Sequence, residues 1–136
     1  MPYSTKYRGK KEYLLVYAEL INAARCRGSL TYPEVAEVMG LPLSGNHMGK
    51  EVGQLLGEIS QEECEQGRPM LSVLVYSAHG RTGGGFFDLA RELGKLQART
   101  AEGEERFLEQ ERDAVYTAWK RTPRAPVAKG VAPEEP

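Results

Sequence analysis

Two amphipathic segments joined by a short turn that contains glycine and proline constrain the fold of this chain more than any other feature. The first segment, Tyr32–Met39, follows the pattern Thr31-x-x-Glu34. This is a capping box, in which each side chain can accept a hydrogen bond from the backbone N–H of the other residue. Gly40 then ends the helical period, and a longer amphipathic segment follows the turn. A short helix, a turn and a longer helix are typical of the helix-turn-helix.

The longer segment and the stretches around it complete a mainly helical pattern. Ser44 or Asn46 can cap the longer helix, whose apolar positions keep the helical period to about Gln66. Residues 69–76 are rich in Val and Leu and predict a buried strand that begins at Pro69, where a missing N–H is tolerated. Glycine-rich residues 77–85 predict a turn or wing. Further helices are expected over residues 9–27, 86–93 and 101–121, so the fold class is mainly α with minor β.

The length and composition of the chain are those of one small globular domain. Its 136 residues suffice to bury a core without metal or disulfide cross-links. We expect a flexible basic arm over residues 1–8, a helix-turn-helix domain over residues 9–121, and a disordered proline-rich tail over residues 122–136. The longest apolar run, Leu71–Val75, is too short to cross a bilayer, and no apolar signal region follows the basic start. We therefore expect a cytoplasmic protein with no membrane partner and reduced thiols.

Charge is distributed unevenly along the chain, although the net charge is only −1. Residues 1–30 hold six Lys or Arg against two Glu, and residues 31–67 hold one Lys against seven Glu. Residues 68–99 hold five Lys or Arg against two acidic residues. A basic start and a basic later segment around an acidic middle can give the molecule one positive face, although such runs are also typical of ordinary solvated surfaces.

Several polar side chains fall where a helix-turn-helix meets a nucleic acid. The first turn of the longer helix would present Asn46, His47 and Lys50 beside free backbone N–H groups and the positive end of the helix dipole, which suit a phosphate. Arg81, in the glycine-rich turn, would also reach the backbone. Basic residues of the arm and of the first helix would add contacts; these are Lys6, Arg8, Lys10 and Lys11. The alternative is a core of packed helices without a ligand, and the five glutamates of the longer helix must in any case point away from phosphate.

Four short motifs occur in an informative order. They are Thr31-Tyr32, Gly49-Lys50-Glu51-Val52-Gly53, Pro69-Met70-Leu71-Ser72-Val73 and Gly83-Gly84-Gly85-Phe86-Phe87. In their order and spacing, which extend across about half of the chain, they resemble the DNA-binding domain of alkylguanine-DNA alkyltransferases. The resemblance implies a winged-helix-like fold in which Tyr32 lies beside the backbone of a flipped nucleotide. It also implies that Lys50 takes the place of an arginine that fills the gap in the base stack; because lysine lacks the planar group that stacks on bases, a phosphate contact suits Lys50 better.

The chain departs from this family at the alkyl acceptor. The family's cysteine falls on Met70, its histidine on Leu71 and its arginine on Ser72. Alkyl transfer needs a thiolate and a nearby base, and a thioether beside a leucine supplies neither. In this respect the chain is similar to the alkyltransferase-like proteins, which lack the cysteine and bind DNA without repairing it, although those hold Trp or Ala where this chain holds Met. We expect no catalytic residue, no cofactor and no metal, because the two histidines have no further ligand at metal spacing.

The sequence thus predicts a non-catalytic protein that binds the backbone of double-stranded DNA and, as the resemblance implies, modified bases. The expected DNA-binding residues are Lys10, Lys11, Tyr32, Asn46, His47, Lys50 and Arg81, with Met70 at the acceptor position. The main alternative is a protein-binding adaptor or inhibitor that uses its acidic helices and the aromatic residues Phe107, Tyr116 and Trp119. An enzyme that uses Cys26 or Cys64 is a third interpretation, and the oligomeric state stays open.

Overall fold

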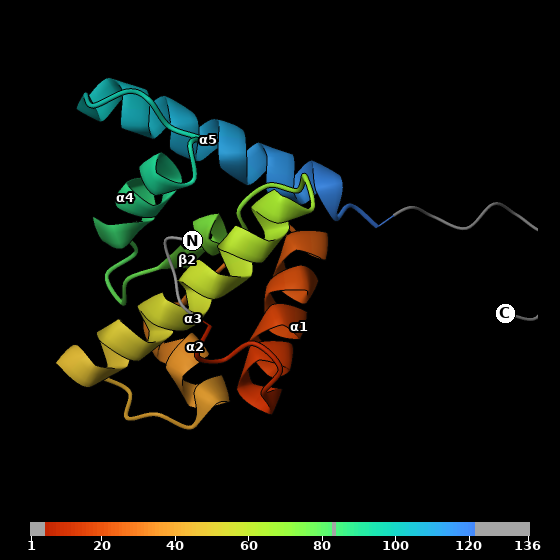
Figure 1. Cartoon of the computed structure of the whole chain (residues 1–136), viewed down its shortest axis with the longest axis vertical. Coiled ribbons are helices and arrows are strands. Elements are labelled where there is room, and N and C mark those ends of the chain that lie inside the picture. Colours follow the sequence, from red (N-terminus) through yellow and green to blue (C-terminus); the bar gives the residue numbers. More distant parts are fainter. Residues whose placement is uncertain (1–4, 83, 122–136) are drawn as a thin grey trace, which may run out of the picture.

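The computed structural model describes residues 5–82 and 84–121, and within these residues five α-helices surround one core (Figure 1). The elements in chain order are α1 (Lys11–Arg25), β1 (Leu30–Thr31), α2 (Tyr32–Met39), α3 (Asn46–Glu65), a 3-10 helix (Leu71–Leu74), β2 (Val75–Tyr76), α4 (Gly84–Glu92) and α5 (Ala101–Ala118). A mainly helical fold with a minor β-element is confirmed. The first half of the expected arm and the expected tail lie outside the described residues.

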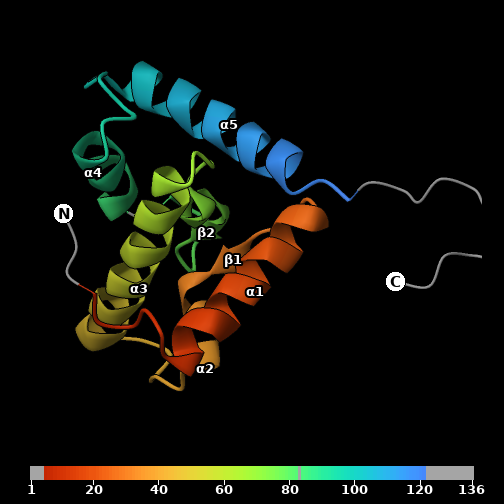
Figure 2. The same ribbon diagram turned by 45° about the vertical axis from the view of Figure 1, so that its right-hand side comes forward.

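Helix α3 occupies the centre of the molecule. Helices α1 and α2 pack against it, and α5 crosses the 3-10 helix and the end of α1 (Figures 1 and 2). Val52, Leu55 and Ile59 recur at helical spacing along α3 and have no exposed surface. Burial of a side chain of this kind stabilises the fold by about 1.5–3 kcal/mol. The position of α3 therefore follows from its apolar stripe.

The signals at the helix ends are confirmed in part. Thr31 Oγ1 accepts from Glu34 N at 3.3 Å and Glu34 Oε1 accepts from Thr31 N at 2.7 Å, so the expected capping box is present. Gly40 ends α2 in the left-handed region, with φ of 78°. The expected cap of α3 by Ser44 or Asn46 is wrong: Gly45 occupies the cap position with φ of 98°, a conformation that favours glycine, and no side chain caps the helix.

The expected strand over residues 69–76 is also wrong for most of its length. Leu71–Leu74 form a 3-10 helix, and only Val75 and Tyr76 pair, in parallel, with Leu30 and Thr31. Residues 70–75 are all buried, whereas a strand in a small sheet alternates a buried with an exposed side chain. An apolar run that is buried on every side cannot be assigned to a strand by its period.

The N-terminal segment is attached to α3 through one carboxylate. Glu58, which is 2% exposed, accepts hydrogen bonds from the backbone N–H groups of Lys6 at 2.8 Å, Tyr7 at 3.0 Å and Arg8 at 3.0 Å. Hydrogen bonds to a charged group contribute about 1.5–3 kcal/mol each. Residues 6–8 therefore belong to the folded domain, in contrast to the flexible arm expected for them.

Tyrosine hydroxyls add a second attachment between the N-terminal part of the chain and α3. Tyr7 donates to Glu51, Tyr13 to Glu62 and Tyr17 to Glu63. Burial, and next the hydrogen bond to a carboxylate, raises the pKa of Tyr7 and that of Tyr17 from 10.0 to about 12. The pKa of Tyr13 is raised for the same reasons. The folded state thus requires these hydroxyls in their protonated form.

We predict that stability falls at alkaline pH for this reason. The folded-state pKa of Tyr7 and Tyr17 lies above the ordinary value, so their contribution is complete below pH 10 and is lost as the pH rises from 10 to about 12. Thermal unfolding followed by circular dichroism should show a midpoint lower by roughly 5 °C at the upper end of this range. The variant Tyr7→Phe/Tyr17→Phe should show a shallower decline, and a decline as steep as the parent's would contradict the assignment.

Candidate nucleic-acid interface

The first turn of α3 is exposed and lacks a side-chain cap. Asn46, His47 and Lys50 are all exposed there. Gly49 N donates to Gly45 O at 3.2 Å, and no side chain of residues 5–82 or 84–121 caps the N–H groups that precede it. Free N–H groups at a helix start carry partial positive charge and can bind an anion. The structure therefore brings together the three residues that the sequence placed in this turn.

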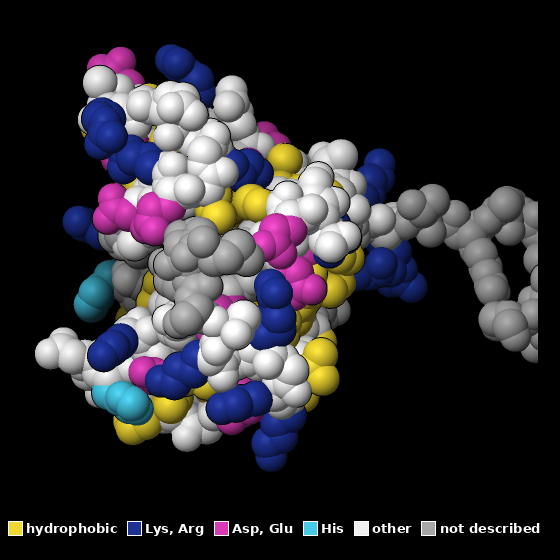
Figure 3. Space-filling model, in the orientation of Figure 1, with side chains coloured by type: hydrophobic (Ala, Val, Ile, Leu, Met, Phe, Trp, Pro, Cys, Tyr) yellow, Lys and Arg dark blue, Asp and Glu magenta, His cyan; other side chains and the backbone are white. Residues whose placement is uncertain are grey.

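Basic residues from the start of the chain flank this turn on one side. Lys6 Nζ lies 2.6 Å from Glu51 Oε1, and Lys10 Nζ lies 5.9 Å from the centre of the Tyr7 ring. The hydrogen bonds from Lys6 and then Tyr7 lower the pKa of Glu51, and His47 adds an attraction in the same direction. Figure 3 shows lysine and arginine side chains on the lower part of this face, over the starts of α1 and α3, with a histidine beside them. Lys10 and Lys11 are exposed at the start of α1.

The short hairpin after β2 flanks the turn on the other side. Ser77 N donates to Arg81 O at 2.7 Å, and an antiparallel bridge joins Tyr76 to Thr82. The hairpin lies beside the start of α3, because both line one cavity of about 330 Å³; its lining is Tyr32, Pro33, Leu43, Ser44, Gly45, Met48, Ser77 and Ala78. Arg81 is exposed. The turn expected over residues 77–85 is shorter in the structure, because α4 already begins at Gly84.

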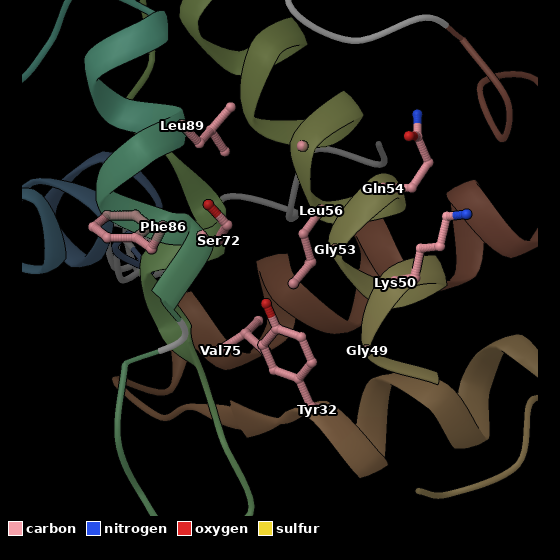
Figure 4. Close-up of a pocket in the computed structure, with 12 residues that line it drawn as sticks. Tyr32, Gly49, Lys50, Gly53, Gln54, Leu56, Ser72, Val75, Phe86 and Leu89 are labelled. Atoms are coloured by element: carbon pink, nitrogen blue, oxygen red, sulfur yellow. The ribbon is translucent and has the colours of Figure 1, made fainter. Parts of the chain in front are cut away.

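A second cavity of about 320 Å³ opens between α3, α4 and the start of α2 (Figure 4). Its walls are largely apolar, with a few polar side chains; the lining comprises Tyr32, Gly49, Lys50, Gly53, Gln54, Leu56, Gly57, Ser72, Val75, Gly85, Phe86 and Leu89. The Tyr32 ring is directed into the cavity, whereas Lys50 and Gln54 project from α3 at its edge (Figure 4). Concave, mostly apolar sites with a few polar groups are typical of small-molecule recognition. We call it the Tyr32 cavity.

Glycines on α3 keep one wall of the Tyr32 cavity bare. Gly49, Gly53 and Gly57 are four residues apart and therefore lie on one face of the helix. A Cβ atom added at Gly49 or Gly53 would meet no other atom within 4 Å. Glycine inside a helix costs about 1 kcal/mol relative to alanine, so packing does not explain these two residues. The four-residue spacing of these glycines is present in the sequence, but the sequence analysis did not predict the cavity that they line.

The residue at the acceptor position does not reach the cavity. The Met70 side chain has no exposed surface, and its backbone N–H donates to Glu111 Oε2 at 2.8 Å. Leu71 is equally buried. Ser72 does line the cavity, but its hydroxyl bonds to Ser60 Oγ at 2.7 Å and has no basic side chain as a hydrogen-bond partner. The described residues thus place neither a thiol nor a general base in the Tyr32 cavity.

Cys64 lies in a different place, against a shallow cavity of about 440 Å³ that also meets Lys95 and Glu111. Lys95 and Glu111 form an ion pair, which the sequence did not indicate. Burial is the largest influence on the Cys64 thiol and raises its pKa; Lys95 opposes this effect and Glu111 adds to it. A thiol with a raised pKa is a weak nucleophile at neutral pH. Cys26 is exposed at the end of α1.

Two other properties of the described residues bear on function. No group of three or more His, Cys, Asp or Glu side chains among residues 5–82 and 84–121 could hold a metal ion. None of the helices within the same residues is both long and apolar enough to cross a bilayer.

Comparisons of the chain with protein-family models, with curated proteins and with solved structures found no match. The resemblance to alkyltransferases consequently stays a prediction from the sequence motifs.

We predict that neither thiol behaves as a catalytic nucleophile. In the single-cysteine variants Cys26→Ser and Cys64→Ser, alkylation by iodoacetamide at pH 8 should be about tenfold slower at Cys64 than at Cys26, because only Cys26 is exposed and the pKa of Cys64 is raised. Mass spectrometry of timed samples gives both rates. Alkylation of Cys64 faster than that of the unfolded chain would indicate an activated thiolate and would favour the enzyme interpretation.

Proposed function

We propose that this chain is a non-catalytic protein that binds double-stranded DNA, with a winged-helix-like domain whose α3 start meets the phosphate backbone. The observation that carries the proposal is the composition of this end of the molecule. An exposed helix start without a side-chain cap is flanked by Lys10 on one side and by Arg81 on the other. Phosphate groups favour both free N–H groups and lysine or arginine side chains.

Three of the five glutamates of α3 support the proposal, because they have partners inside the fold and do not compete for this surface. Glu51, Glu58 and Glu63 are all buried. Glu51 pairs with Lys6, Glu58 accepts backbone N–H groups, and Glu63 pairs with Arg68 at 2.8 Å. If α3 binds DNA, its carboxylates must not face the phosphates. These three glutamates meet that requirement.

The Tyr32 cavity gives the same surface a second function. It adjoins Lys50, so a nucleotide whose phosphates lie along the start of α3 could place its base between Tyr32 and Phe86. An unstacked base needs an apolar, partly aromatic pocket to offset the cost of extrusion, which is a few kcal/mol. The walls formed by Leu56, Val75 and Leu89 supply such surface. We therefore propose that modified bases, which leave the stack at lower cost, bind there without reaction.

The adaptor interpretation has less support in the structure. Phe107, Tyr116 and Trp119 are partly buried and pack against the core, so little of their surface is open to a partner. The large exposed apolar side chains are instead Leu14, Leu15 and Leu43. Among the described residues these are the large apolar side chains open to a partner, and none of them belongs to the aromatic set that suggested an adaptor.

We predict that the double variant Lys50→Glu/Arg81→Glu loses affinity for duplex DNA. Each phosphate contact contributes about 0.9 to the slope of log K against log salt concentration, so the slope should fall by roughly 2. Fluorescence anisotropy with one labelled duplex across a salt series measures both quantities. Arg99→Glu/Arg106→Glu, exposed residues before and on α5 with the same charge change, should match the parent. If both variants lost the same affinity for duplex DNA, or if neither lost any, the assignment of Lys50 and Arg81 would be refuted.

We predict that Gly53→Ala changes stability and base recognition in opposite directions. The added methyl group has open space around it and improves helix propensity, so the free energy of unfolding in urea should rise by about 1 kcal/mol. The same methyl group narrows the Tyr32 cavity, so any preference for a duplex with a modified guanine over a plain duplex should shrink. Asn22→Ala, a helix-favouring change on the exposed side of α1, should leave that preference intact. A stabilised Gly53→Ala variant that keeps the full preference would exclude this cavity as the base site.

A further inference from the structure

A second group of exposed basic residues lies at the opposite end of the molecule from the start of α3. The C-terminal ends of α1 and α5 meet there, and lysine and arginine side chains stand out along the right-hand edge in Figure 3 (compare Figures 1 and 2). The members of this group, which we call the distal basic surface, are Arg25, Arg27, Lys120 and Arg121. Among the described residues, no carboxylate forms an ion pair with any of the four.

Arg27 is the left-handed residue that ends α1: its N–H donates to Ala24 O at 3.2 Å, and Gly28 N donates to Ala23 O at 2.7 Å. Its φ of 56° is positive, which in the described part of the chain occurs at no other residue besides glycines. Glycine is the residue that adopts this region without strain, and here an arginine occupies it. The end of the helix explains this backbone conformation, and what a glycine would not supply at this position is the positive charge of the side chain.

The guanidinium of Arg27 is also fixed in place. It lies 4.7 Å from the centre of the Tyr116 ring, and the Tyr116 hydroxyl donates to Gly28 O at 2.8 Å. This arrangement stacks the cation on an aromatic face and ties that face to the residue next to Arg27. A guanidinium that is oriented before binding loses less entropy when it bonds to a phosphate through two N–H groups.

The ordinary explanation for basic residues at helix C-termini is compensation of the helix dipole. It accounts for Arg25 in the last turn of α1 and for Lys120 just after α5. It does not account for Arg27, which lies beyond the last turn of α1 and whose guanidinium lies against the Tyr116 ring. Burial raises the pKa of Tyr116 and the charge of the Asp113 carboxylate adds to this effect, but Asp113 forms no ion pair with any of the four basic residues.

The two basic surfaces are separated by most of the length of α3. Arg68 bonds to Glu63 near the end of α3 and lies 5.7 Å from the ring of Trp119, which directly precedes Lys120. From Asn46 to Glu63 a helix rises by about 25 Å. The surfaces lie at opposite ends of the described part of the molecule, and a duplex held at the start of α3 need not cover the distal basic surface (Figures 1 and 2).

We propose that the distal basic surface binds the phosphate backbone of a second DNA duplex, so that one molecule of this protein holds two duplexes together. The inference rests on the proposed function of the α3 start, which supplies the first duplex. The chemistry at the distal surface is sequence-independent, because it consists of exposed cations that meet phosphate rather than base edges.

A bridging assay tests this inference. One biotinylated duplex is fixed on streptavidin beads, the full chain is added, and capture of a second, fluorescent duplex is measured. The variant Arg27→Gly/Arg121→Ala should capture about tenfold less, since two phosphate contacts of about half a log unit each are lost. Anisotropy with a single duplex should still show the binding that Lys50→Glu/Arg81→Glu removes, and the glycine should keep or raise the thermal midpoint, so that a folding defect is not the cause.

Two controls separate the possible failures. Arg99→Ala/Arg106→Ala carries the same charge change elsewhere and should capture like the parent; an equal loss in this variant overturns the inference. A mixture of Lys50→Glu/Arg81→Glu with Arg27→Gly/Arg121→Ala should not restore capture, because each molecule then lacks one surface; restoration would show that bridging arises from association between protein molecules and overturns the inference. Parent protein that binds single duplexes without capturing a second one also refutes it, whereas absence of any duplex binding refutes the proposed function itself.

Discussion

The buried carboxylate of Glu58 is the interaction on which the arrangement of charge in this molecule depends. An ionised carboxylate inside a protein is very unfavourable unless hydrogen bonds compensate for the lost water, and three consecutive N–H groups of residues 6–8 do so here. Their position brings Lys6 to Glu51 and Tyr7 into the core. Two carboxylates of the acidic middle, those of Glu51 and Glu58, thereby find their partners within the fold.

The glycines of α3 show a second constraint, in which helix stability and an open surface oppose each other. A helix of 20 residues that must hold the centre of the core would be better built with alanine at positions 49 and 53, since space exists for both methyl groups. The cost of keeping glycine is tolerated because the other face of α3 is firmly packed through Val52, Leu55 and Ile59. The stabilisation from the buried face of α3 thus offsets the destabilisation by the glycines that line the cavity on its other face.

The parts of the fold that local chemistry determines could be predicted from the sequence. The capping box at Thr31 and the glycine end of α2 depend on neighbouring residues alone, and both were identified. The strand expected at residues 69–76 and the flexibility expected for residues 6–8 were wrong for a common reason. The structure of each depends on contacts with distant residues, such as Ser60 with Ser72 or Glu58 with Tyr7, which no periodicity reveals. The candidate site was predictable in its exposed residues, and the cavity behind them was not, because a cavity is a property of the packed helices.

The placement of α1 explains why the basic first 30 residues do not form one positive face. The helix has 15 residues and so spans roughly 22 Å, with Lys10 and Lys11 at its start and Arg25 and Arg27 at its end. Its start lies near the start of α3, and its end lies against α5, so four of the six basic residues come to one end of the molecule and two, Arg25 and Arg27, to the other (Figure 2). At physiological ionic strength the screening length is about 8 Å, much shorter than this separation. The two ends therefore act on anionic partners independently, and Arg27 contributes only to the end at which its guanidinium lies against Tyr116.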